Sequence, residues 1–171
     1  MGRQLTPDEV KELALQLVLG PTLMVLRGYA SQEASDTYIR ARELCQKIGE
    51  TPQLFPVLWG VYLVSFVRGE YKTAYELGEQ LLKLGQQTQD SALLMEAHYA
   101  LSLSSLWLGN LQQARKHGEQ SIAFYNPQQH RTHTFFYGQV SGVHSLICVG
   151  LTLWLLGFPD QALQKIQHAL T

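Results

Sequence analysis

The sequence is poor in cysteine, lacks a long apolar run and carries no excess of charge of either sign. Two cysteines in 171 residues make neither a disulfide framework nor a zinc site, so we expect a reducing, cytoplasmic setting. The 13 Lys and Arg side chains are balanced by 14 Asp and Glu side chains, which leaves no basic excess for nucleic acid or an anionic membrane. The most apolar run, residues 146–158, is shorter than the roughly 20 residues of a membrane span. We therefore expect neither a nucleic-acid nor a membrane partner.

Motifs of catalysis and cofactor binding are also missing. The sequence contains no Gly-x-x-x-x-Gly-Lys-Ser/Thr phosphate loop and no Gly-x-Ser-x-Gly nucleophile turn. Cys45 and Cys148 fall on apolar helix faces, where a thiol behaves as a small hydrophobic group. The polar, acidic N-terminus does not resemble a signal peptide. We expect no catalysis, no cofactor and no bound metal.

Helical periodicity is present along almost the whole chain. One such set steps by four and three residues, namely Ala34, Tyr38, Ala41, Cys45 and Ile48. Steps of this kind place the apolar side chains on one face of a helix. We find no alternation of period two and therefore expect no strands. The sequence predicts an all-α fold.

Helix boundaries are marked by capping residues. Thr6-Pro7-Asp8-Glu9 reads as a capping box, and Ser31 and Asp90 are further N-cap candidates. Left-handed C-caps are expected at Gly28, Gly49, Gly69, Gly109 and Gly157. Gly20-Pro21 predicts a kink or a break in the first helix.

An internal repeat organises the chain. The segments 69–74, 109–114 and 157–162 each begin with glycine and end with alanine, and 28–34 is a looser copy. Successive starts of the first three lie 40 and 48 residues apart. Each glycine ends one helix, and each alanine stands where the next helix approaches closely. The repeating unit is therefore an antiparallel helical hairpin.

Stacked hairpins would bury faces that one hairpin leaves exposed. We expect one domain, 1–171, with the architecture of an α-solenoid of about four units. The expected units are 6–49, 50–89, 90–140 and 141–171.

The turns at 69–74 and 109–114, with the Val149-Gly150 pair, resemble the tetratricopeptide repeat (TPR) family. The spacing of 40 or more exceeds the family's 34 residues, which implies a long-helix variant. The segments 41–45, 49–60 and 125–131 are also similar to the C-terminal repeat region of bacterial signalling ATPases fused to cyclases or kinases. This resemblance implies a non-catalytic, regulatory or partner-binding scaffold in bacterial signalling. An oligomerisation or structural module of a larger ATPase or cyclase regulator is the alternative.

A TPR-like array implies a concave groove lined by the first helix of each hairpin. Large aromatic and aliphatic residues are common interface anchors. The candidate groove residues are Trp59, Leu63, Phe66, Tyr99, Leu103, Trp107, Ile147 and Trp154. A protein or peptide would bind there, or these residues would instead form ordinary packing between hairpins.

The long connection 126–142 is a second candidate site. It contains His130, Arg131, His133 and Tyr137. A metal-dependent enzyme would use the two histidines, but no neighbouring carboxylate completes a metal site. A structured loop or part of a binding surface are the other interpretations.

Two remaining features lie outside these candidates. The histidines at 98, 117, 144 and 168 show no helical pairing with a carboxylate or cysteine, and we expect them to be structural or surface groups.

The last helix carries an apolar stripe that includes Leu163 and Leu170. Repeat arrays need a polar capping helix. We therefore expect a piece of a longer array or a homo-oligomer formed through this C-terminal helix; the alternative is a stripe that packs under an earlier helix.

Overall fold

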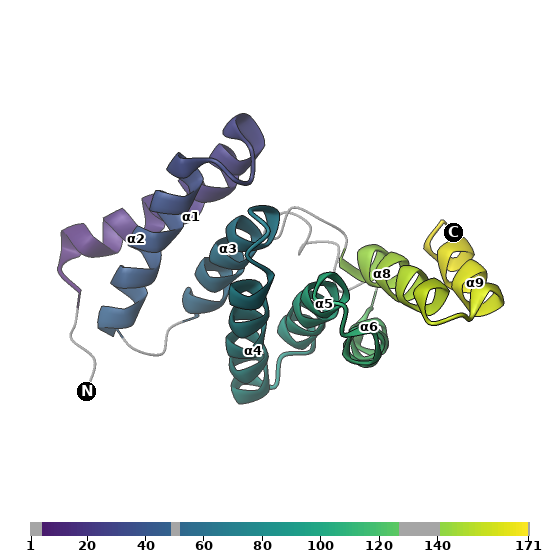
Figure 1. Ribbon diagram of the computed structural model, residues 1–171. Coiled ribbons are helices and arrows are strands. Elements are labelled where there is room, and N and C mark those ends of the chain that lie inside the picture. Colours follow the sequence, from purple (N-terminus) through teal and green to yellow (C-terminus); the bar gives the residue numbers. More distant parts are fainter. Residues whose placement is uncertain (1–4, 49–51, 127–140, 171) are drawn as a thin grey trace. The chain divides into compact units, whose positions relative to one another are not determined.

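A computed structural model describes residues 5–48, 52–126 and 141–170, and every regular element in these ranges is a helix (Figure 1). The helices are α1 (Pro7–Arg27), α2 (Gln32–Ile48), α3 (Leu54–Val67), α4 (Tyr71–Thr88), α5 (Ser91–Trp107), α6 (Leu111–Phe124), α8 (Ser141–Leu155) and α9 (Pro159–Ala169). The all-α prediction is confirmed for these residues. Each helix in these ranges is too short or too polar to cross a lipid bilayer.

The chain divides into two compact units, Met1–Glu70 and Tyr71–Thr171. Unit 1 contains α1, α2 and α3, and unit 2 contains α4, α5, α6, α8 and α9. The division falls within the segment 50–89, for which the sequence predicts one hairpin.

The predicted N-caps form. Thr6 accepts from the Glu9 N–H at 3.3 Å, and the Glu9 carboxylate accepts from the Thr6 N–H at 3.0 Å. These two bonds complete the capping box at the start of α1. The Ser31 hydroxyl accepts from the Ala34 N–H, and the Asp90 carboxylate accepts from the Ala92 N–H at 2.8 Å.

Three of the repeat glycines make the same turn. Gly69, Gly109 and Gly157 have φ of 80°, 78° and 86°. Each glycine N–H donates to the carbonyl three residues earlier, at 3.0, 3.1 and 3.0 Å. The following N–H donates to the carbonyl five residues earlier, at 2.9, 2.8 and 2.9 Å. This pair of bonds is the Schellman motif, so the repeat in the sequence is a repeat in backbone geometry.

The N-terminal copy of the turn differs from the other three. Gly28 also has positive φ, 97°, but its ψ of 151° is extended and its N–H bonds to the Met24 carbonyl. This copy, 28–34, is also one residue longer than the other three. Gly49 lies outside the described residues.

Of the two expectations for Gly20-Pro21, the break is wrong, because α1 continues through both residues to Arg27. The kink stays a prediction. Proline removes one backbone donor, but a helix held by its neighbours tolerates that loss. Gly20 is buried against the ring of Tyr38, which holds this part of α1 on α2.

Unit 1 is built around Tyr38, which lies between two glycines. A Cβ atom on Gly20 of α1 would stand 2.6 Å from the Tyr38 ring, and one on Gly60 of α3 would stand 2.0 Å from it. Only glycine leaves room for the ring on both sides. A second cluster of buried residues contains Leu13, Leu44 and Val57 from the same three helices.

Ion pairs fix the direction of α1 against α2. Arg40 binds Glu12 through two bonds, at 2.7 and 2.9 Å, and Lys47 binds Glu9 at 2.7 Å. The later residue of α2 pairs with the earlier residue of α1, so the helices are antiparallel, as predicted for the first hairpin. The bond to Lys47 lowers the pKa of Glu9 to about 2, and the bond to Arg40 lowers the pKa of Glu12.

Buried serines join α5 to α6 in unit 2. The Ser102 hydroxyl donates to the Ala114 carbonyl at 2.7 Å, and the Ser121 hydroxyl donates to the Met95 carbonyl at 2.9 Å. The order of these pairs makes the two helices antiparallel. Ala114 is fully buried, which agrees with its predicted place at a close helix approach.

Small residues also let α8 pack closely against α6. A Cβ on Gly118 would stand 2.4 Å from Val149, and Ser121 and Ser145 share a hydrogen bond of 2.8 Å. Gly150 of α8 packs against Ile166 of α9. A Cβ on Gly150 would stand 2.7 Å from the Ile166 side chain. The small side chains therefore set the spacing of α6, α8 and α9.

Candidate functional site

The eight predicted groove residues differ in accessibility. Trp59 of α3 and Tyr99 of α5 are buried, with 2% and 5% exposed. The half-buried members are Leu63, Phe66 and Leu103. The exposed members are Ile147, Trp107 and Trp154, with 38%, 58% and 66% exposed. The three exposed residues all belong to unit 2.

An apolar surface covers the outer side of α8 and the turn to α9. We call it the α8 face. It consists of Ile147, Leu151, Trp154, Leu155 and Phe158, all exposed. Leu146, Val149 and Leu153 are buried on the opposite side of α8. The helix is thus apolar on both sides, whereas a surface helix usually has one polar face.

Aromatic contacts connect the helix ends at one end of unit 2. Trp107 stacks on Tyr71 with ring centroids 5.5 Å apart. The guanidinium of Arg115 lies 5.8 Å from the ring centre of Phe158, within the range of a cation–π contact. Each contact lies beside one of the repeated turns, because Trp107 ends the helix before Gly109 and Phe158 directly follows Gly157. Arg115 also donates to the Glu119 carboxylate at 2.8 Å.

Unit 2 also contains a histidine pair that the sequence did not reveal. His98 Nδ1 of α5 and His117 Nδ1 of α6 lie 3.0 Å apart. The Phe124 ring stacks on His98 with centroids 5.9 Å apart and planes inclined by 11°. The two histidines are 19 residues apart across the Gly109 turn. Only knowledge of how α5 and α6 pair would have signalled this contact.

Burial favours the neutral form of both imidazoles. Burial, the neighbouring His117 and Lys116 lower the pKa of His98 to about 4. Burial and Lys116 also lower the pKa of His117. One neutral ring can donate to the other, whereas two protonated rings would oppose two N–H groups at 3.0 Å. In the described parts of the chain, no group of three or more His, Cys, Asp and Glu side chains could hold a metal.

Both cysteines are buried, as the apolar faces predicted. Burial raises the pKa of Cys45 to about 11, and burial also raises the pKa of Cys148. Cys148 lies 3.3 Å from the Ser102 hydroxyl inside unit 2. Thiols with raised pKa carry little thiolate at neutral pH and are weak nucleophiles.

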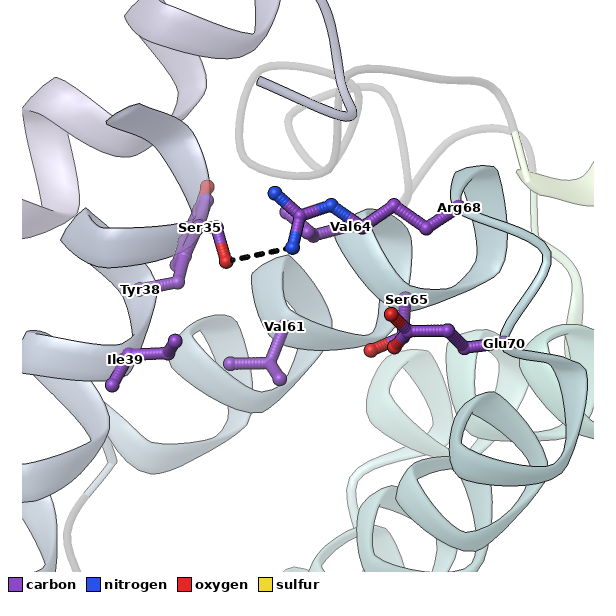
Figure 2. A pocket seen from close by; sticks show the side chains of 8 residues that line it. All are labelled: Ser35, Tyr38, Ile39, Val61, Val64, Ser65, Arg68 and Glu70. Atoms are coloured by element: carbon purple, nitrogen blue, oxygen red, sulfur yellow. Dashed lines mark hydrogen bonds between the residues drawn. The ribbon is translucent and has the colours of Figure 1, made fainter. Parts of the chain in front are cut away.

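A small cavity of about 140 Å³ lies in unit 1 between α2 and α3 (Figure 2). Its walls include Tyr38, Ile39 and Val61, and Arg68 reaches across its rim to the Ser35 hydroxyl at 3.3 Å. The guanidinium also donates to the Ala30 carbonyl at 3.2 and 3.3 Å. Arg68 therefore ties the end of α3 to the turn before α2. Ligand pockets are usually larger than about 300 Å³.

We predict that Arg68→Ala lowers the stability of unit 1 by about 1–2 kcal/mol, because several hydrogen bonds to the turn are lost. Urea denaturation measures this effect through the fluorescence of buried Trp59, in a background with Trp107→Phe and Trp154→Phe. Arg68→Lys keeps the charge but loses the planar set of donors, so it should recover only part of the loss. A full recovery by lysine would contradict the role of the donors.

The candidate residues of the 126–142 connection, His130, Arg131, His133 and Tyr137, lie outside the described residues. The other predicted lone histidines are on α8 and α9. His144 of α8 packs its ring near Tyr99, with centroids 6.2 Å apart. His168 is exposed near the end of α9.

Comparison with known proteins places the chain in no family, since no protein-family model and no curated protein matches it.

Proposed function

We propose that the chain is a non-catalytic, TPR-like scaffold that binds a protein or peptide through the α8 face. The observation that carries this proposal is the exposure of Trp154 beside exposed Leu151 and Leu155 on one side of α8. Apolar surfaces that include large aromatic groups are typical of interaction sites. The resemblance of segments 41–45, 49–60 and 125–131 to the repeat region of bacterial signalling ATPases supports a regulatory role in bacterial signalling.

The chemistry of the surface defines the expected partner. An amphipathic helix could lay apolar side chains between Trp154 and Leu151. The repeated Schellman turns and close packing of small residues in unit 2 support this role, because they hold the face on rigid helices.

Partner capture tests the proposal. The wild-type chain and a Leu151→Ser/Trp154→Ser variant are immobilised, and bound proteins from a bacterial lysate are identified by mass spectrometry. A protein held by the wild type is then purified and its dissociation constant measured by calorimetry. We expect at least tenfold weaker binding by the double variant, because tryptophan side chains that become buried in a complex commonly contribute about 2 kcal/mol or more to the binding free energy.

Val67→Ser is the matched control, since Val67 is also an exposed apolar residue but lies on α3. It should leave binding unchanged. Circular dichroism checks that all variants keep their helices. Equal binding of every captured protein by the wild type and the double variant would refute the α8 face as the site.

A further inference from the structure

A second exposed apolar surface lies on α1, far in sequence from the α8 face. Leu13, Gly20 and Met24 are buried on the inner side of α1. The outer side of α1 is apolar and exposed. The exposed fractions are 69%, 70% and 78% for Leu15, Val18 and Val25, and the neighbouring Leu19 and Leu26 are also exposed. A helix that is apolar on both sides is usually covered on both sides. We call this surface the α1 face.

The spacing along the α1 face fits a helical partner. Leu15, Val18, Thr22 and Val25 follow one another at steps of three, four and three residues. Steps of this kind are the a and d positions of a coiled coil, in which one helix packs its side chains between those of another. Extended peptides and irregular loops do not require this spacing.

The pattern is complementary to itself in the antiparallel direction. When two copies of α1 run in opposite directions about an axis near Gly20, Leu15 meets Val25 of the second copy. In the same arrangement Val18 meets Thr22 of the second copy, and Leu19 lies close to the axis. A twofold axis makes each contact occur twice. Antiparallel coiled coils pair a positions with d positions, as these contacts do.

Charge favours the antiparallel direction over the parallel one. The row of a and d positions, which would form the seam between the two helices, continues towards the start of α1. It includes Lys11 and Asp8, whose side chains are 76% and 96% exposed. Parallel copies would place Asp8 against Asp8 and Lys11 against Lys11. Antiparallel copies separate these like charges, and they also oppose the two helix dipoles.

A lipid surface fits the α1 face less well. Helices that lie on membranes carry rows of Lys and Arg beside their apolar side. The flanks of α1 carry Glu12 and Gln16, and its cations are Lys11 and Arg27 near its two ends.

We propose that two copies of this chain associate through their α1 faces as an antiparallel helix pair. This self-association goes beyond partner binding by the α8 face and does not depend on it. It assigns the exposed residues of α1 to a symmetric interface that contains no residue of the α8 face.

Cysteine cross-linking tests the direction and the register. Leu15→Cys and Val25→Cys are prepared as separate variants, and they are oxidised alone and as an equimolar mixture. In the proposed pair the two different positions are adjacent, whereas identical positions are separated by ten helical residues, or about 15 Å. A disulfide needs Cα atoms within about 7 Å. We expect cross-linked dimer mainly in the mixture, several-fold above either variant alone.

The native thiols do not interfere, because Cys45 and Cys148 are buried. Equally efficient cross-linking of Leu15→Cys alone would indicate parallel helices and would overturn the proposal. Sedimentation of the wild type as a monomer at high concentration, without cross-links in the mixture, would overturn it as well.

Two charge variants locate the interface independently. Val18→Glu should weaken dimerisation at least tenfold in analytical ultracentrifugation, since it buries a carboxylate at the seam. Leu163→Glu on α9 is the matched control and should leave the dimer unchanged. Loss of the dimer only with Leu163→Glu would place self-association on the C-terminal helix and would reject the α1 face. Because Leu151→Ser/Trp154→Ser leaves α1 intact, failure of partner binding and failure of dimerisation remain distinguishable.

Discussion

Replacing Gly60 by alanine should destabilise unit 1 by about 2 kcal/mol, although alanine is the better helix former. A methyl group at position 60 would stand 2.0 Å from the Tyr38 ring. The ring cannot move away freely, because the backbone at Gly20 closes its other side. Overpacking of this kind costs about 1–3 kcal/mol or more, which outweighs the gain of about 1 kcal/mol in helix propensity.

Urea denaturation followed by Trp59 fluorescence measures this loss, in the background that lacks Trp107 and Trp154. For a unit of this size a loss of 2 kcal/mol lowers the midpoint of thermal unfolding by about 8–16 °C. Gly85→Ala in α4 is a comparison in unit 2, followed through Trp107 and Trp154 in a Trp59→Phe background. A Cβ there would stand 3.2 Å from Leu94, not 2.0 Å from an aromatic ring, so the loss should be smaller than at Gly60.

Tyr38→Leu identifies the cause. Leucine at position 38 is smaller, so Gly60→Ala should lower the free energy of unfolding less in the Tyr38→Leu variant than in the wild type. We expect a coupling free energy between the two substitutions above about 1 kcal/mol. Additive effects of the two substitutions would show that the ring is not the obstacle.

Acid should destabilise unit 2 through the His98–His117 pair. The folded pKa of His98 is about 4, below the ordinary histidine pKa of about 6.5, so the unfolded chain binds more protons between these values. The contribution of neutral His98 to stability is therefore complete above pH 6.5 and is lost as the pH falls towards 4. The full shift corresponds to about 3 kcal/mol, and we expect about 1–2 kcal/mol because the ring is only half-buried.

Thermal unfolding between pH 7 and pH 4.5 measures this loss through Trp107 and Trp154, in a Trp59→Phe background. The window separates the histidines from Glu9 and Glu12, whose stabilising contributions are lost mainly below pH 4.5. His98→Asn removes the titrating ring and should flatten the profile. An unchanged pH dependence in this variant would assign the effect to other groups.

Local features of the fold were predictable from the sequence. Glycine tolerates positive φ far better than other residues, so Gly69, Gly109 and Gly157 could be assigned to helix ends without a structure. The capping box at Thr6 is equally local. The break expected at Gly20-Pro21 failed because contacts with α2 hold α1 together, and such contacts are not local.

The candidate site was less predictable. Trp59 and Trp107 look alike in the sequence, since both are aromatic residues on apolar helices, yet one is buried and the other exposed. Helices that are apolar on two sides give no signal of which side faces inward. The His98–His117 contact crosses a turn, so it depends on the register between α5 and α6.

The sequence by itself determined that the chain is helical, where most helices start and stop, and that three turns share one geometry. These properties follow from backbone dihedral preferences and from hydrogen bonds between near neighbours. Only the tertiary structure decided which apolar faces remain uncovered and which histidines meet. Those outcomes depend on how whole helices pack, and there glycines such as Gly60 and Gly118 set the distance between backbones.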